Sequence, residues 1–270
     1  MLVFPNAKIN LGLRITEKRS DGFHNIETVF VPIPLKDALE FVVSADGETR
    51  FSSEGIKLDS SPDQNLVMKA YQLLANDFKL PSLDIVLLKN IPFGAGLGGG
   101  SADAAFMLSA LNDEFKLDLN TNQLKQYAAK IGADCSFFIE NKACYATEKG
   151  DVLEGYELNL KGLFLVLVKP DVYVSTPQAY AGVKPKQPAD DLRELLHQPL
   201  EAWKQTVVND FEESIFERFP SIARVKTDLY ELGAVYASMS GSGSSVFGLF
   251  REPVDTKGLF DSSYIWTATL

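Results

Sequence analysis

The chain has 270 residues, of which 46% are hydrophobic and 23% are charged, and its formal net charge is −10. A chain of this length can bury one large core or two smaller ones, and the composition is that of a globular protein. The acidic balance argues against a nucleic-acid or membrane partner, because basic patches supply most of the affinity for both. A polyanionic substrate must therefore be held by local donors.

The sequence also restricts the compartment in which the protein works. Its longest clear apolar run, residues 163–168, has the length of a strand, whereas a bilayer-spanning helix needs about 20 residues. Lys8 and Asn10 interrupt any signal-peptide pattern at the N-terminus. Cys135 and Cys144 are the only cysteines, so the sequence contains no disulfide framework and no four-ligand zinc pattern. We therefore expect a reduced, cytoplasmic protein.

In chain order, the first predicted element is a β-strand over residues 7–13, where apolar and polar side chains alternate. The apolar side chains face one side of this strand, and Lys8 and Asn10 face the other. From the pattern alone, a solvated edge face is the favoured explanation of these two polar residues.

A turn at Asp21 and Gly22 precedes a second strand over residues 23–30, which is typical of a hairpin. His24 follows this turn directly, together with Phe23. From the pattern alone, a histidine in this place is more often a surface or capping residue than a ligand.

A helix is predicted to begin with Ser61 as its N-cap, Pro62 at the first helical position and Gln64 completing a capping box. Asn65 would then lie in the first turn. The pattern by itself makes Asn65 a tolerated surface residue.

Five glycines fall within residues 94–100, and a hydrophobic core does not explain that density. Residues 83–88 before them have the pattern of a strand, and residues 101–111 after them are rich in helix formers. Glycines allow successive N–H groups to point at one anion, and the start of a helix adds free N–H groups and a partial positive charge. The pattern predicts a phosphate-binding loop; a glycine-rich turn that only permits close packing is the alternative.

The loop contains a G-x-G-x-x-G match at Gly94, Gly96 and Gly99, which by itself is a weak signal. A dinucleotide-binding fold also needs an acidic residue that closes a second strand about twenty residues later. Glu114 has this spacing but falls at the expected end of a helix. Because no lysine follows the glycines, backbone groups and Ser101 must hold the phosphates.

Asp134 lies between two predicted elements. A helix capped by Asn120 is expected to stop at Gly132, and the apolar residues 135–139 are expected to form a strand. A carboxylate placed there is partly desolvated, which is unfavourable unless a cation is near. Lys8 or a metal ion could supply that charge, and a simple turn cap is the alternative.

The second half of the chain shows strands, a second glycine loop and a further helix start. The pattern weakens around residues 150–155, so we place a boundary between two lobes there. Thr176 is expected to cap a helix that begins with Pro177, and the small residues of the second loop suit a close approach to phosphates. The expected strands cover residues 160–168, 234–237 and 246–250, with the second glycine loop at residues 239–245.

These motifs together resemble the GHMP kinases, the family of galactokinase, homoserine kinase and mevalonate kinase. Residues 92–105 are similar to the family's nucleotide loop, P-x-x-x-G-L-[GS]-[SG]-[GS]-[SA]-[AS]. The other family patterns occur in the same order as in the family: A-K-[IVL]-N-L at 7–11, D-G-[YF]-H at 21–24, G-A-D at 132–134, [VI]-[SP]-T at 174–176 and N-D-[FL]-E at 209–212.

The resemblance implies an α+β fold of two lobes, with the glycine-rich phosphate loop between a strand and a helix. It implies an N-terminal ATP-binding domain over residues 1–153 and a C-terminal domain over 154–270. Residues 96–105 are closer to the branch that phosphorylates the 2-hydroxyl of 4-diphosphocytidyl-2-C-methyl-D-erythritol in the non-mevalonate isoprenoid pathway.

The resemblance also implies the cofactors and the residues of the site. ATP and Mg²⁺ are expected, with Lys8 and Asp134 as the catalytic residues and no protein metal ligand assigned. The acceptor is expected to contact Asn10, Phe23, His24 and Thr176. The residues expected to bind ATP are Asn65, Pro92, Phe93, Gly94, Ala95, Gly96, Leu97, Gly98, Gly99, Gly100, Ser101 and Ala102.

Two residues depart from the family pattern: Phe23 stands where many members have tyrosine, and Ser136 stands where proline is usual. Three alternatives remain open from the sequence. A GHMP kinase could act on another alcohol, and a dinucleotide-dependent oxidoreductase would use the G-x-G-x-x-G match. A non-catalytic nucleotide-binding protein would be expected to lack Lys8 or Asp134, and both are present.

Overall fold

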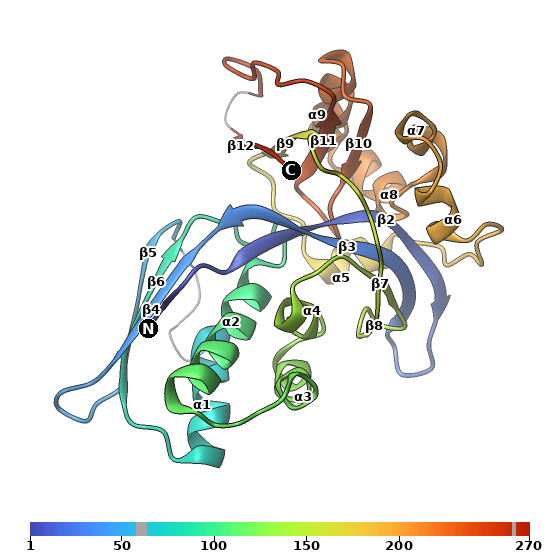
Figure 1. Cartoon of the computed structure of the whole chain (residues 1–270). Coiled ribbons are helices and arrows are strands. Elements are labelled where there is room, and N and C mark those ends of the chain that lie inside the picture. Colours follow the sequence, from blue (N-terminus) through green and yellow to red (C-terminus); the bar gives the residue numbers. More distant parts are fainter. Residues whose placement is uncertain (58–63, 261–262) are drawn as a thin grey trace. The chain divides into compact units, whose positions relative to one another are not determined.

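A computed structural model describes residues 1–57, 64–260 and 263–270 (Figure 1). Contacts divide the chain into two compact units, which we call unit 1 and unit 2. Unit 1 comprises Met1–Lys8, Pro34–Phe93 and Gly98–Lys142. Unit 2 comprises Ile9–Ile33, Gly94–Leu97 and Ala143–Leu270.

The two units are not consecutive pieces of the chain. The long strands β2 (Asn6–Lys18) and β3 (His24–Lys36) lie mostly in unit 2, although they precede nearly all of unit 1 in the sequence. The compact units therefore differ from the expected domains 1–153 and 154–270, because a local change of pattern does not reveal which later strands an early strand will join. That two-domain division stays a prediction.

The described residues of unit 1 form one four-stranded sheet and four α-helices. The strand order is β1-β4-β6-β5, in which only the β5–β6 pair is parallel. Alternate side chains of β4 and β6, among them Phe41 and Ile85, pack in one core with α1 and α2, which lie beside these strands in Figure 1. The elements are β1 (Leu2–Val3), β4 (Ala38–Val43), β5 (Arg50–Gly55), β6 (Leu83–Lys89), α1 (Leu66–Phe78), α2 (Gly99–Phe115), α3 (Thr121–Ile131) and α4 (Cys135–Glu140).

The start of α1 corrects the sequence prediction. Asn65 is the N-cap, and its side-chain oxygen accepts a hydrogen bond from Val67 N at 2.9 Å. Asn65 therefore precedes the helix rather than lying in its first turn. Its carboxamide makes the cap bond that was expected of Ser61, which lies with Pro62 outside the described residues.

Two further predictions concern the segment from α3 to α4. Asn120 caps α3 as expected, with a full capping box to Gln123, and Gly132 is the C-cap. The strand expected over residues 135–139 is wrong, because these residues form the short helix α4. Its buried residues, including Phe137 and Phe138, form one contiguous run, and a short apolar run does not distinguish a buried strand from a buried helix.

Unit 2 contains two four-stranded sheets, of order β2-β3-β7-β8 and β10-β11-β9-β12. The strand expected over residues 160–168 begins later, at Phe164, and the one expected at 234–237 begins at Tyr236, whereas residues 246–250 are confirmed as a strand. The remaining elements are β7 (Cys144–Thr147), β8 (Val152–Gly155), β9 (Phe164–Lys169), β10 (Tyr236–Met239), β11 (Val246–Phe250), β12 (Tyr264–Thr269), α5 (Thr176–Ala181), α6 (Leu192–Leu196), η2 (Leu200–Ala202), α7 (Trp203–Thr206), α8 (Phe211–Arg218) and α9 (Pro220–Glu231).

Two expectations drawn from composition can be compared with the fold. Cys135 and Cys144 are both buried, and neither is part of a disulfide. Across the described ranges, no helix is both long enough and apolar enough to cross a bilayer.

Candidate active site

The glycine loop joins β6 to α2, so the predicted order of strand, loop and helix is confirmed. The helix begins at Gly99, two residues before the expected start. Gly98 is its N-cap, with φ of +70° and no side-chain cap. The first N–H groups of a helix have no partner within the helix, so those of Gly99, Gly100 and Ser101 could bind an anion. We call this part of α2 its predicted anion-binding end.

The short side chains of the loop anchor it to the protein. Ala95, Leu97 and Ala102 are buried, whereas Phe93 is exposed. Gly98 could not be replaced without displacing its neighbours, since a Cβ there would lie 2.9 Å from Phe138 Cζ and 3.2 Å from Lys8 Cε. A backbone that approaches its surroundings so closely is what a phosphate-binding loop requires.

Lys8 and Asp134 meet in unit 1. Lys8 Nζ lies 3.6 Å from Asp134 Oδ2, and the Asp134 side chain is 35% exposed. Lys8 itself is only 3% exposed. Burial lowers the pKa of Lys8, while the charge and the hydrogen bond of Asp134 act in the opposite direction. The solvated edge face considered for Lys8 and Asn10 is therefore wrong, because both residues are buried.

The position of Asp134 can also be compared with its alternative role as a cap. Asp134 is the N-cap residue of α4, but its side chain makes no capping hydrogen bond. The thiol of the next residue, Cys135, hydrogen-bonds Ser101 in the first turn of α2. Asp134 thus directly precedes a residue that contacts the first turn of α2, and its carboxylate is partly open to solvent.

The second glycine loop, between β10 and β11, packs directly on the first one within unit 2. Ser240 Oγ donates to Gly96 O at 2.8 Å, and Ser245 N donates to Ala95 O at 3.2 Å. A Cβ on Gly96 would lie 1.9 Å from Ser240 O. These serine and backbone donors therefore hold the first loop, whereas a direct approach of the second loop to phosphates stays a prediction.

The N-D-F-E motif of residues 209–212 fixes the base of this second loop, a role that the sequence did not reveal. Asn209 Nδ2 donates to Met239 O at 2.8 Å and to Gly241 O at 2.9 Å. Glu212 Oε1 accepts from Met239 N at 2.8 Å. These contacts join residues about thirty positions apart, so no local pattern could have indicated them.

Three of the four residues expected to bind the acceptor lie in two places in unit 2: Phe23 and His24 where β3 begins, and Thr176 on α5. Phe23 is 60% exposed at the turn before β3. The ring of His24 stacks on that of Tyr180, with centroids 4.8 Å apart and planes inclined by 22°. Thr176 lies four residues before Tyr180 on α5, so both lie on one helix face. Tyr180 is a residue that the sequence analysis did not assign to the site.

The state of the His24 ring follows from its surroundings. Burial and the nearby charge of Lys18 lower the pKa of His24. The lowered pKa favours the neutral imidazole, in which one nitrogen donates and the other accepts. Such a ring can pair with the edge of a nucleobase.

Asn10 and Thr176 can also be placed in their local structure. Asn10 Nδ2 donates to Thr28 Oγ1 at 3.0 Å. Thr176 is the first residue of α5 rather than its N-cap, because Ser175 caps the helix and forms a capping box with Gln178. The structure leaves substrate contacts of Asn10 and Thr176 as predictions.

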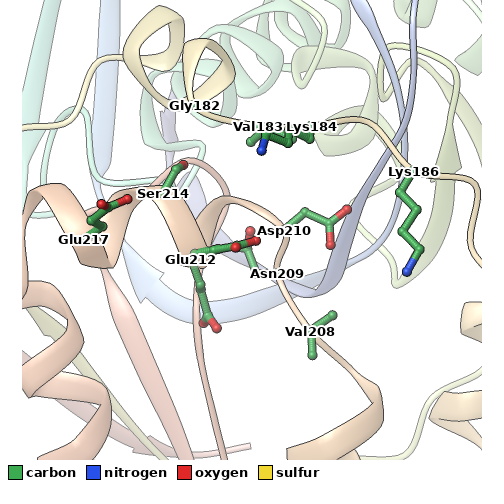
Figure 2. Close-up of a pocket in the computed structure, with 11 residues that line it drawn as sticks. Gly182, Val183, Lys184, Lys186, Val208, Asn209, Asp210, Glu212, Ser214 and Glu217 are labelled. Atoms are coloured by element: carbon green, nitrogen blue, oxygen red, sulfur yellow. The ribbon is translucent and has the colours of Figure 1, made fainter.

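A cavity of about 530 Å³ in unit 2 contains none of the predicted site residues. Figure 2 shows the carboxylates of Asp210, Glu212 and Glu217 and the amine of Lys186 around it. Two of its lining residues have bonds that stabilise the fold: Glu212 binds the second glycine loop, and Asp210 Oδ2 accepts from Ile15 N at 2.7 Å. We therefore do not assign the chemistry to this cavity.

The described residues contain no group of three histidine, cysteine or acidic side chains that could hold a metal ion. Mg²⁺ commonly uses only one or two carboxylates and takes its other ligands from phosphates and water. The partly exposed carboxylate of Asp134, which precedes the contact of Cys135 with the predicted anion-binding end of α2, fits that kind of site.

Comparisons with known proteins agree with this geometry. The family model "GHMP kinases N terminal domain" matches residues 65–141, and "GHMP kinases C terminal" matches residues 187–258. A protein of Bacteroides fragilis named 4-diphosphocytidyl-2-C-methyl-D-erythritol kinase is 53% identical over 273 residues and 100% of both chains. The protein of the same name from Parabacteroides distasonis is 53% identical over 272 residues, again over 100% of both chains.

Solved structures show the same relationship. A crystal structure of 4-(cytidine 5'-diphospho)-2C-methyl-D-erythritol kinase has a TM-score of 0.85 and 30% identity, over 99% of this chain and 98% of that chain. The mevalonate kinase of Methanococcus jannaschii has a TM-score of 0.76 over 100% of this chain and 98% of that chain, and its 12% identity shows the shared fold alone.

With its uncapped α2, its glycine loop and these full-length matches, the chain belongs to the GHMP kinase family. This confirms the expected α+β kinase fold and removes the support for a dinucleotide-binding fold. Within the family, the chain groups with the 4-diphosphocytidyl-2-C-methyl-D-erythritol kinases, which it matches over its whole length.

Proposed function

We propose that the chain transfers the γ-phosphoryl group of ATP to the 2-hydroxyl of 4-diphosphocytidyl-2-C-methyl-D-erythritol, a step of the non-mevalonate isoprenoid pathway. The observation that carries this proposal is the Lys8–Asp134 pair against the uncapped start of α2. The pair supplies a base and a cation, and the helix supplies donors for phosphate. The whole-length relatives support the choice of acceptor.

Phosphoryl transfer passes through a loose transition state, so the protein mainly aligns the reacting groups and stabilises charge. Asp134 accepts the proton of the attacking hydroxyl. The Lys8 ammonium, 3.6 Å from the Asp134 carboxylate, offsets negative charge at the reacting oxygens. Mg²⁺ neutralises charge on the phosphates when it is bound, and Asp134 is the carboxylate that would lie near it.

The nucleotide is held mainly by backbone groups. The N–H groups of Gly99, Gly100 and Ser101 take the phosphates, and the remaining loop residues from Pro92 to Ala102 shape the cradle. Asn65, at the start of α1, is proposed to contact the adenine. Its neighbour Leu66 lies near the loop, since Leu66 Cδ1 would be 3.7 Å from a Cβ on Gly100.

The acceptor is recognised in unit 2. Phe23 offers an exposed aromatic face for stacking on cytosine, and the neutral His24 ring, held by Tyr180, presents polar groups to the edge of the base. Asn10 and Thr176 are proposed to contact the remainder of the acceptor.

The assay that tests this proposal follows ADP formation from MgATP with and without the cytidylyl acceptor. We expect turnover that depends on the acceptor, with mevalonate and homoserine giving no more than the background rate. Turnover with another alcohol, and none with the cytidylyl compound, would leave the family assignment and reject the acceptor.

Base discrimination provides a sharper prediction about the same site. Stacking on Phe23 tolerates any base, so selectivity must come from hydrogen bonds to the base edge, and a mismatched buried donor or acceptor costs about 1–3 kcal/mol. We expect the uridine analogue to have a kcat/KM at least tenfold lower. His24→Ala should narrow this gap, and Phe23→Ala should weaken both substrates alike.

The matched control is His197→Ala, because His24 and His197 are the only histidines and His197 lies outside the proposed site. It should preserve both rates and their ratio. Equal kcat/KM values for the cytidine and uridine compounds in the unmodified enzyme would show that these residues do not read the base.

A further inference from the structure

A buried cluster of three charged residues joins the two ends of the phosphate loop in unit 1. Lys89 is the last residue of β6, Asp37 lies between β3 and β4, and Asp103 lies in α2. Lys89 Nζ donates to Asp37 Oδ2, and to Asp103 Oδ2 at 2.8 Å. All three residues are buried. The cluster therefore ties the strand before the loop to the helix after it.

The cluster also fixes the residues that lead into the loop. Asp37 Oδ1 accepts the backbone N–H groups of Asn90 at 2.5 Å and of Ile91 at 2.8 Å. These are the two residues between Lys89 and Pro92. On the other side, a Cβ on Gly99 would lie 2.8 Å from Ile91 Cγ2 and 3.4 Å from Lys89 Nζ. The start of α2 thus packs directly on Lys89 and Ile91. We call residues 89–91, which lead into the loop, its stem.

The balance of charge within the cluster is unusual for a stabilising ion pair, because two carboxylates share one ammonium. Among the described residues, Asp103 Oδ1 has no hydrogen-bond partner although it is buried. Burial raises the pKa of Asp103 to about 7, Lys89 opposes this effect and Asp37 adds to it. Buried ion pairs are weak evidence for stability, and in some proteins they serve to specify one arrangement.

We propose that Asp37, Lys89 and Asp103 are positioning residues that set the stem of the phosphate loop, so that the N–H groups of Gly99, Gly100 and Ser101 converge on the phosphates of ATP. This inference rests on the nucleotide-binding role proposed for the loop. The three residues act through the backbone and touch no reacting atom. Their loss should therefore alter the interaction with ATP more than the interaction with the acceptor.

The test compares Asp103→Ala with Asp103→Asn in the full chain. Alanine removes the acceptor of Lys89, whereas asparagine restores an oxygen of the same reach without a charge. We expect Asp103→Ala to raise the KM for ATP at least fivefold and to change the KM for the acceptor less than twofold. Asp103→Asn should keep the KM for ATP within twofold of that of the unmodified enzyme.

A purely structural role would lower the melting temperature of Asp103→Ala and leave the KM for ATP unchanged, and that result would overturn the proposal. Equal values of this KM for the alanine and asparagine variants would do the same. Asp37→Asn is a second, isosteric variant in case Asp103→Ala does not fold. Both oxygens of Asp37 accept hydrogen bonds, Oδ1 from the backbone N–H groups of Asn90 and Ile91 and Oδ2 from Lys89, so asparagine, with one oxygen, must lose one of these two sets. Asp103 uses only one of its oxygens, which is why asparagine can replace it. We therefore expect Asp37→Asn to keep the Lys89–Asp103 pair and to increase the KM for ATP at least threefold.

The activity of the unmodified enzyme distinguishes a failure of the proposed function from a failure of the positioning role. If it turned over no ATP with the cytidylyl acceptor, the proposed function would fail. If it were active and the folded Asp37→Asn and Asp103→Ala variants kept its KM for ATP, only the positioning role would fail.

Discussion

Asp134→Asn is expected to lower kcat by about 10²-fold or more, because asparagine cannot accept the proton of the attacking hydroxyl and a positioned general base contributes about 10²–10⁴-fold. The amide has nearly the same volume as the carboxylate. It also removes the charge that opposes the effect of burial on the pKa of Lys8. Steady-state kinetics with saturating ATP and acceptor would measure the loss.

The fold and the binding of ATP should survive this change. The Asp134 side chain is 35% exposed, its nearest cation is 3.6 Å away, and its N-cap position contains no capping bond to lose. Asp113→Asn, at an exposed position on α2, is the matched control and should retain full turnover. A near-normal kcat for Asp134→Asn with an unchanged melting curve would show that Asp134 is not the general base and has only a local structural role.

Gly96→Ala is expected to raise the KM for ATP at least tenfold and to lower the free energy of unfolding by about 2 kcal/mol or more. Gly96 has φ of +75°, which is strained for alanine, and its Cβ would lie 1.9 Å from the backbone oxygen of Ser240. A backbone atom cannot swing away as a flexible side chain can, so the two glycine loops must separate. Thermal melting and an ATP titration would measure the two effects.

Gly47→Ala is the control that separates the effect of backbone strain from the effect of a steric clash. Gly47 has φ of +80°, but nothing lies within 4 Å of the Cβ that alanine would add. This variant should be destabilised only by the cost of the left-handed backbone conformation, roughly 1–2 kcal/mol, and should keep the KM for ATP. Equal effects of the two substitutions would mean that contact between the glycine loops contributes nothing to nucleotide binding.

Local patterns predicted the parts of this protein that depend on neighbouring residues. The density of glycines after an apolar strand indicated the phosphate loop, and Asn120 with Gln123 indicated the start of α3. The alternation of residues 7–13 placed Lys8 and Asn10 on one face. Whether that face was solvated or buried could not be known from alternation, since burial depends on what packs against the strand.

The errors and omissions have the same physical origin. The run after Asp134 fits a strand or a short helix equally well, and packing in unit 1 decides for the helix. The stacking of Tyr180 on His24 and the Lys89–Asp37 pair, 52 residues apart, depend on contacts between distant segments. A single sequence contains no local signal for such contacts.

The interleaving of the two units has a consequence for synthesis of the protein. Leu13, Ile15 and Ile26 are synthesised well over a hundred residues before Val166 and Phe250, but all five belong to the same core. Unit 1 has all its residues once Lys142 has been made, whereas unit 2 already begins at Ile9 and still needs the residues that follow Lys142. The nascent chain must therefore keep the early apolar strands of unit 2 from aggregating while most of unit 1 is synthesised.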